Sequence, residues 1–304
     1  MEYVLQANSL SKNYFGFHAI NNLNINVPKG SIYGLVGKNG AGKTTLIRLI
    51  CGLQPPTSGE FSIYGAKFNE KAVNKSRSRM GAVVESPAIY SNMSAADNLK
   101  MQYRMLGIPS FDNIPDLLKL VGLSGTGRKK TKNFSLGMKQ RLGIAIALAG
   151  DPDFLILDEP INGLDPQGII EMRELILRLN REKNITILIS SHILEELAKL
   201  ATHYGFMEKG TILKEISSEE LEKACRKSVL AEVSDMEALT RTLDRMNIEY
   251  TVNDERKADI FGKISISQLV HELDSENCEL ISVTEHDESL ESYFINLVGG
   301  EKNA

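Results

Sequence analysis

The chain has 304 residues, of which 42% are apolar and 24% are charged, and its formal net charge is −4. This composition is ordinary for a globular protein, and the length predicts about two domains. The net negative charge gives no electrostatic basis for a nucleic-acid partner. No apolar stretch approaches the roughly 18 residues that a membrane helix needs, and the N-terminus lacks the basic and apolar segments of a secretory signal.

A glycine-rich loop follows the first buried strand that the pattern predicts. Residues 31–36 read as a strand, residues 37–44 are Gly-Lys-Asn-Gly-Ala-Gly-Lys-Thr, and an apolar helical pattern follows. Glycines let such a loop, here called the phosphate loop, curl its N–H groups toward phosphate oxygens at a helix N-terminus. Lys43 is expected to reach the β- and γ-phosphates of a nucleotide, and the Thr44 hydroxyl to ligate Mg²⁺. The residues predicted to bind the nucleotide here are Gly37, Asn39, Gly40, Gly42, Lys43, Thr44 and Thr45. A purely structural turn is the alternative, which the complete motif in this context disfavours.

Two further segments lie between the phosphate loop and the apolar run at residues 154–157. Residues 90–123 read as mostly helical. Residues 133–141, Asn-Phe-Ser-Leu-Gly-Met-Lys-Gln-Arg, place Ser135 and Gly137 at the start of a helix. A Ser-x-Gly loop in this position is a second anion-binding device. The chain therefore carries two predicted anion-binding loops.

Two buried strands end in polar groups. Residues 154–157, Phe-Leu-Ile-Leu, precede Asp158 and Glu159, and residues 187–192 end in Ser-Ser-His. Continuous apolar runs are typical of strands that are covered on both faces, and open α/β sheets place ligands at the carboxyl ends of such strands. Asp158 is expected to hold the Mg²⁺ shell directly or through water. An isolated Asp-Glu pair is usually a solvated turn, and a lone His is usually structural, but the preceding strands favour a functional site.

These motifs resemble those of the ATP-binding cassette (ABC) ATPases. The resemblance implies an α/β fold, an ABC-type P-loop NTPase domain with a helical subdomain. It assigns Glu159 as the carboxylate that polarises the attacking water, with Lys43 and His192 as further catalytic residues. His192 then senses the γ-phosphate of ATP.

The same resemblance assigns two nucleotide contacts outside these motifs. Asp165, within residues 162–166 (Asn-Gly-Leu-Asp-Pro), matches the loop that communicates across a dimer of cassettes. Tyr14 matches the aromatic residue that stacks on adenine. Phe15 is the competing candidate for this contact. The alternative for either residue is a place in the core with no contact to the nucleotide.

The family resemblance also implies partners. Two cassettes pack head to tail, so that ATP on one phosphate loop is clamped by Ser135 and Gly137 of the other cassette. ATP binding closes this dimer and hydrolysis reopens it, and the opening and closing drive an integral-membrane permease subunit. This places the chain in the cytoplasm, peripheral at the inner face of the membrane. A non-transport cassette acting on ribosomes or DNA is the alternative, and a scaffold without turnover is disfavoured by Glu159 and His192.

Two departures from the usual family motifs set this chain apart. Glu85 stands where most cassettes have Gln, which predicts a third carboxylate near Asp158 and Glu159 and a place in the Mg²⁺ site. Residues 134–138 are Phe-Ser-Leu-Gly-Met, where Leu-Ser-Gly-Gly-Gln is commonest. Both variants resemble the cassettes that serve bacitracin and lantibiotic resistance or export.

The pattern changes after a final predicted hairpin at residues 207–213. We expect a nucleotide-binding domain at 1–215 and a small α+β accessory domain at 216–304, which resembles a ferredoxin-like module. Its predicted strands are 228–233, 249–252, 258–261 and 278–283, and its predicted helices are 217–227, 235–245, 265–273 and 288–297. No chemistry is visible in this part, because His271 and His286 lack ligand-like spacing. Cys51, Cys225 and Cys278 fit neither a disulfide framework nor a metal site.

Overall fold

The computed structural model describes residues 2–224, 228–261, 265–286 and 290–299. The chain divides into two units, Met1–Ser218 and Glu219–Ala304. The predicted domain boundary at residue 215 falls within the last strand of the first unit. Cys225 and the last part of the predicted helix 217–227 lie outside the described residues. In the described part of the chain, no helix combines the length and the apolar character that crossing a bilayer requires.

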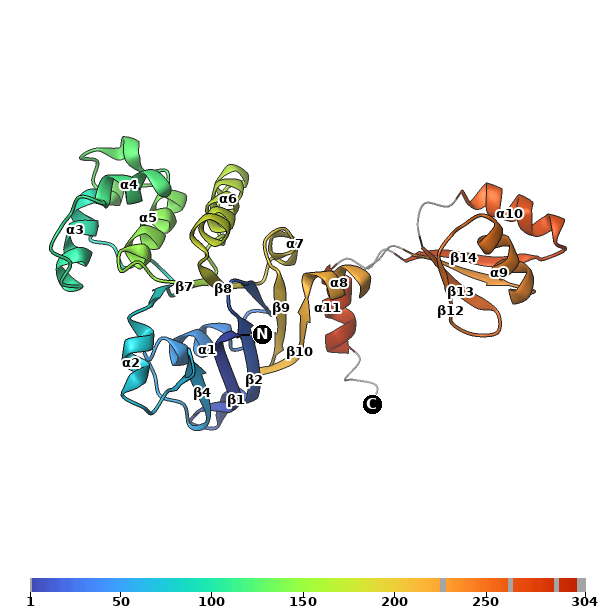
Figure 1. Cartoon of the computed structure of the whole chain (residues 1–304), viewed down its shortest axis with the longest axis horizontal. Helices are drawn as coiled ribbons and strands as arrows, with labels where there is room; N and C mark the ends of the chain where they lie inside the picture. The colour runs from blue at the N-terminus through green and yellow to red at the C-terminus, as the bar shows by residue number, and fades with distance from the viewer. Residues whose placement is uncertain (1, 225–227, 262–264, 287–289, 300–304) are drawn as a thin grey trace. The chain divides into compact units, whose positions relative to one another are not determined.

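A six-stranded sheet carries the predicted motifs. Its spatial order is β10 (Thr211–Ser217), β9 (His203–Glu208), β3 (Ile32–Val36), β8 (Thr186–Ser191), β7 (Phe154–Asp158) and β6 (Met80–Val83). Figure 1 labels four of these strands, β7, β8, β9 and β10. Only β10 is antiparallel to its neighbour. Every residue of β3, β7 and β8 is buried, as their apolar runs predicted. Because these adjacent strands are parallel, their carboxyl ends meet at one edge of the sheet.

An antiparallel sheet and one helix complete the core of the first unit. The sheet has the order β2 (Phe17–Pro28), β1 (Tyr3–Tyr14), β4 (Ser58–Ile63) and β5 (Ala66–Lys67). One apolar cluster joins side chains from both sheets and from α1 (Lys43–Ile50), among them Leu5, Leu46 and Phe154. Burial of the apolar side of α1 holds its N-terminus in place beneath the phosphate loop.

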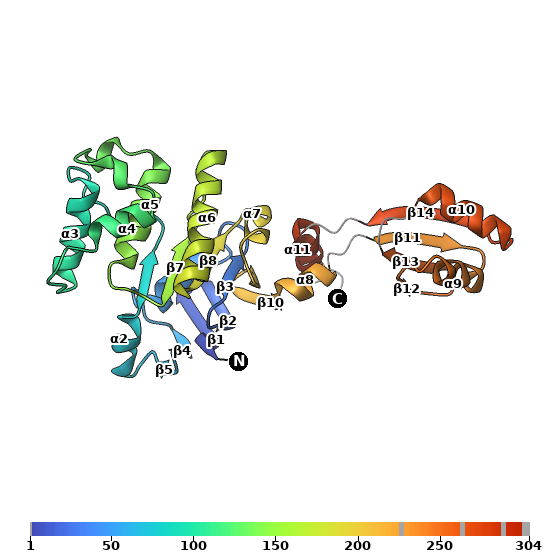
Figure 2. The same cartoon turned by 45° about the horizontal axis from the view of Figure 1, so that its top comes forward.

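The region predicted as mostly helical contains α3 (Ala95–Met105) and α4 (Ile114–Leu120). The Ser94 side chain caps α3 by accepting a hydrogen bond from the Asp97 N–H at 3.2 Å. Both views show α3 and α4 grouped with α5 (Leu136–Leu148) (Figures 1 and 2). The remaining helices of this unit are α2 (Ala72–Arg77), α6 (Pro166–Lys183) and α7 (Leu194–Ala198).

The second unit begins within α8 (Ser218–Ala224) and contains an antiparallel sheet. Its sheet has the order β12 (Tyr250–Val252), β13 (Lys257–Phe261), β11 (Ser228–Val233) and β14 (Leu280–His286). Its helices are α9 (Met236–Arg245), α10 (Ile266–Ser275) and α11 (Leu290–Gly299). Leu239 of α9 and Leu269 of α10 share an apolar cluster with Ala231 and Ile260 of the sheet. The elements from β11 to β14 follow the predicted β-α-β-β-α-β order.

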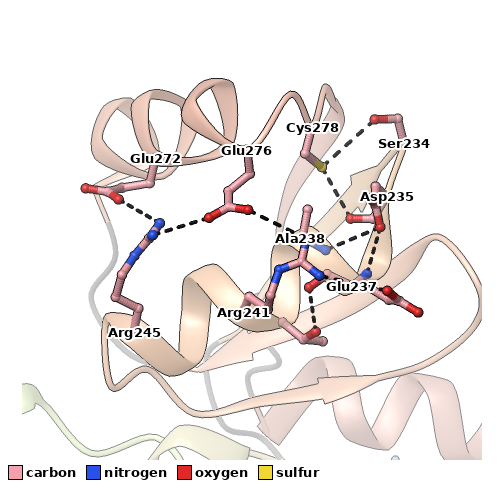
Figure 3. Close-up of polar contacts among 10 residues, drawn as sticks. Ser234, Asp235, Glu237, Ala238, Arg241, Arg245, Glu272, Glu276 and Cys278 are labelled. Atoms are coloured by element: carbon pink, nitrogen blue, oxygen red, sulfur yellow. Dashed lines mark hydrogen bonds and ion pairs between the residues drawn. The ribbon is translucent and has the colours of Figure 1, made fainter.

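Ion pairs join α9 to α10 at the surface (Figure 3). Arg241 lies 3.6 Å from Glu276, and Arg245 lies 3.0 Å from Glu272 and 3.3 Å from Glu276. Exposed pairs of this kind each contribute about 0–1 kcal/mol. The apolar cluster therefore holds these helices on the sheet.

The last strand of this sheet starts two residues later than predicted. The Cys278 N–H donates to the Leu273 carbonyl at 3.0 Å, and the Glu279 N–H donates to Ser234 Oγ at 2.9 Å. Because these two backbone N–H groups bond to atoms outside the sheet, the strand β14 begins only at Leu280.

Candidate functional site

The phosphate loop connects β3 to α1. Gly42 has a φ of 109°, and a Cβ there would lie 2.6 Å from the Ala19 carbonyl oxygen. The Lys43 ammonium donates to the Gly37 carbonyl at 2.6 Å and to the Lys38 carbonyl at 3.3 Å. The loop thus curls around the lysine, and only glycine fits at position 42.

A cavity of about 270 Å³ opens over this loop. It is lined by Phe17, Ala19, Asn39, Gly40, Gly42, Lys43, Thr44, Thr45 and Glu159. Six of the residues predicted to bind nucleotide are therefore brought together. Gly37 does not line the cavity, but its carbonyl accepts the hydrogen bond from Lys43.

The aromatic residue at this cavity is Phe17, which the sequence analysis did not select. Phe17 is 61% exposed, and it is the first residue of β2. Tyr14 is not among the lining residues; its hydroxyl bonds to Gln54, and the Lys12 ammonium lies 5.2 Å from its ring centroid. Phe15 is fully exposed. The only sequence signal for Phe17 was its place after Tyr14 in an aromatic-rich segment.

The predicted magnesium ligands Thr44 and Asp158 are in contact. Thr44 Oγ1 donates to Asp158 Oδ2 at 2.9 Å, and Ser190 Oγ donates to Asp158 Oδ1 at 2.6 Å. Asp158 is 2% exposed. Ser190, which the sequence analysis passed over, therefore fixes the orientation of this carboxylate. A hydroxyl and a carboxylate suit Mg²⁺, which keeps several waters and takes further oxygens from substrate phosphates.

Glu159 joins the other two predicted catalytic residues. Its Oε1 lies 3.2 Å from the Lys43 ammonium, and its Oε2 lies 2.8 Å from His192 Nδ1. Its backbone N–H donates to Ser190 Oγ at 2.9 Å, which holds the residue at a φ of 50°. The Glu159 carboxylate is thus placed between the Lys43 ammonium and the His192 ring.

Glu85 does not join this carboxylate pair. Its half-exposed side chain forms an ion pair with Arg48 of α1. Among the described residues, no three His, Cys, Asp or Glu side chains are arranged to hold a metal ion. Glu85 therefore does not supply the expected third carboxylate near Asp158 and Glu159, since its carboxylate pairs with Arg48. Burial raises the pKa of the Cys51 thiol to about 12, so the thiol is protonated at neutral pH.

A second cavity, of about 260 Å³, lies where α5 and α6 begin. It is lined by Ser135, Gly137, Met138, Arg141, Asp165, Gln167, Gly168, Glu171 and Met172. The predicted residues Ser135, Gly137 and Asp165 are brought together here, and none of the lining residues is shared with the first cavity. The phosphate loop and the Ser135 loop thus line two different cavities.

The fold and these two cavities define a P-loop ATPase of the cassette type. Comparison with known proteins agrees: the ABC transporter family profile matches residues 20–162. The chain is 42% identical to the bacitracin transport ATP-binding protein BcrA of Bacillus licheniformis, over 99% of both chains. It is 44% identical to the lantibiotic transport ATP-binding protein SrtF of Streptococcus pyogenes, over 75% of this chain and 99% of that one.

A solved structure shows the same fold. It is that of cbiO1 from Clostridium perfringens, described as part of the ABC transporter complex cbiONQ, and it superposes with a TM-score of 0.66 at 26% identity. The match covers 81% of this chain and 97% of that one. The chain belongs to the ABC transporter family, as an ATP-binding subunit with ATPase activity.

Proposed function

We propose that Lys43, Glu159 and His192 carry out ATP hydrolysis in this chain. The direct contact of Glu159 with both other side chains is the observation that supports this proposal best. When ATP binds, Lys43 exchanges the Glu159 carboxylate for phosphate oxygens. Glu159, still held by His192, is then free to accept a proton from the attacking water. Phe17 or Tyr14 stacks on the adenine ring.

Thr44 and Asp158 are the residues that hold Mg²⁺ in this proposal. The ion neutralises charge on the phosphate oxygens when it is bound. Ser190 keeps the Asp158 carboxylate oriented through its 2.6 Å hydrogen bond. Glu85 acts outside this set, because its carboxylate is engaged by Arg48.

We further propose that two copies of this cassette pair. The phosphate-loop cavity and the second cavity, which contains Ser135, share no lining residue, and this supports a role for Ser135 at the nucleotide of another copy. In a head-to-tail pair, each Ser135 loop covers the ATP of the other copy, and hydrolysis reopens the pair. An integral-membrane permease subunit converts this motion into transport and holds the chain at the inner face of the cell membrane.

The cargo that we propose is an amphipathic peptide antibiotic. The similarity to the bacitracin transport protein extends over 99% of this chain, whereas the similarity to the lantibiotic transport protein covers 75%. The bacitracin relative thus also spans the second unit. We propose that this unit is a ferredoxin-like module with a structural or regulatory role; its β-α-β-β-α-β order and four-stranded antiparallel sheet support the assignment.

Co-expression in an antibiotic-sensitive host tests the transport function. The chain, together with a permease of about six apolar spans encoded beside it, should raise the bacitracin concentration that stops growth. The Glu159→Gln variant should abolish this protection. Protection that persists in that variant, or an ATPase that responds to ribosomes or DNA and not to permease-containing membranes, would contradict the proposal.

A further inference from the structure

Two helix N-termini meet at the second cavity. Ser135 Oγ accepts a hydrogen bond from the Met138 N–H at 3.3 Å where α5 begins. Asp165 Oδ1 accepts one from the Gly168 N–H at 3.2 Å where α6 begins. The spacing of these two ends decides whether Ser135 and Asp165 can contact one ligand together.

An ion pair ties the same two helices together beside the cavity. Arg141 of α5 pairs with Glu171 of α6, and both side chains line the cavity. Gln167 donates a hydrogen bond to Glu171 at 3.2 Å. This hydrogen bond, together with the hydrogen bond and charge of Arg141, lowers the pKa of Glu171, so its carboxylate is charged at neutral pH.

The loops before the two helices also pack closely. A Cβ added to Gly163 would lie 3.2 Å from a methyl carbon of Leu136, and one added to Gly137 would lie 3.6 Å from Leu164. Gly163 has a φ of 73°, a conformation that favours glycine. The Leu136 side chain therefore rests against the backbone ahead of α6.

Stability alone is a poor explanation for the ion pair. The Arg141 side chain is 17% exposed, and its Nε–H is buried with no hydrogen-bond partner among the described residues. A buried donor without a partner costs free energy, and a partly buried ion pair returns little net stability. What the pair does supply is a defined geometry between two helices.

We propose that Arg141 and Glu171 are positioning residues that hold the N-terminus of α5 against that of α6. They present Ser135 and Asp165 to the nucleotide of the partner cassette as one rigid surface. This inference rests on the proposed pairing of two cassettes.

The test compares Arg141→Met and Glu171→Gln in the hydrolysis-deficient Glu159→Gln protein. Amide hydrogen exchange of the free monomer should become about tenfold faster at Met138 and Gly168. The dissociation constant of the ATP-bound dimer, from sedimentation, should rise about tenfold. ATP affinity of the monomer should stay unchanged, since the phosphate loop is untouched. The double variant should show the same loss as either single variant, because all three break one pair.

Arg173→Met is the matched control. Arg173 lies on α6, as Glu171 does, and it pairs with Glu196 at 2.9 Å. The two side chains are 23% and 15% exposed, but Arg173 does not line the cavity. Its variant should lower Tm while leaving exchange at Met138 and Gly168 and the dimer unchanged. A purely structural role for Arg141 would make the two Arg variants indistinguishable, which would overturn the proposal.

Three other results separate this inference from the proposed function. Unchanged exchange at the two amides would overturn the positioning role even if dimers form normally. Faster exchange together with normal dimer formation would overturn the claim that the ion pair presents Ser135 and Asp165 to the nucleotide of the partner cassette. If the Glu159→Gln parent formed no ATP-dependent dimer, the proposed pairing would be wrong, whereas the exchange data on the monomer would still support or overturn the positioning role.

Discussion

Replacing Glu159 with Gln should separate ATP binding from hydrolysis. The Lys43 ammonium lies 3.2 Å from Glu159 Oε1, and the two side chains are 6% and 19% exposed. ATP must therefore take Lys43 away from Glu159 before the ammonium can bind phosphate. Gln keeps the size of the side chain and removes its charge. The variant should lose the proton acceptor and the competing ion pair at once.

The expected magnitudes follow from this geometry. Unit charges at this separation attract by roughly 5 kcal/mol at an effective dielectric constant of about 20. Desolvation and side-chain ordering reduce the net value to about 1 kcal/mol. The ATP dissociation constant should therefore fall about fivefold. Loss of a general base should lower kcat by roughly 10²–10⁴-fold.

Two measurements on purified protein check these values. Steady-state phosphate release gives kcat, and calorimetric titration with MgATP gives affinity. The titration uses proteins that also carry Ser135→Arg, so that dimerisation does not contribute to affinity. Glu182→Gln, at an exposed position on α6, is the control for the amide substitution and should change neither value. A kcat equal to that of the parent protein would refute the role of Glu159 as base. An unchanged ATP affinity would refute the idea that Glu159 and ATP compete for Lys43.

Three further substitutions test other parts of the site and fold. Ser135→Arg in the Glu159→Gln protein should prevent ATP-induced dimers in sedimentation without changing ATP binding by the monomer; normal dimers would contradict a role in trans. Glu85→Gln should leave the Mg²⁺ and pH dependence of the purified ATPase unchanged, because Arg48 holds this carboxylate; a higher Mg²⁺ requirement would return Glu85 to the metal site. Ser94→Ala should cost about 1 kcal/mol in urea unfolding through loss of the cap. The hydrogen bond from Ser94 lowers the pKa of Asp97, so part of this stability is present above the ordinary Asp pKa and is lost as pH falls through the lowered value. The difference between parent and variant should shrink below about pH 4, and a constant difference would exclude Asp97 from the effect.

The sequence alone predicted those features that depend on neighbouring residues. The strands β3, β7 and β8 were visible as apolar runs, because burial on both faces removes the alternation of polar and apolar side chains. The phosphate loop was visible because the turn into α1 requires glycine at fixed spacing. Asp235 predicted the start of α9, since a cap acts within one helical turn.

Only the tertiary structure decided which side chains meet at the sheet edge. Ser190 lies against Asp158, and Lys43 against Glu159, because the order of the parallel strands brings their carboxyl ends together. Arg48 engages Glu85, a pairing that no local pattern predicts. Charged side chains choose partners by distance across the folded chain, and the sequence records only their order. The local pattern of residues therefore determined the strands, the helices and the phosphate loop. Long-range packing determined which side chains contact one another in the site.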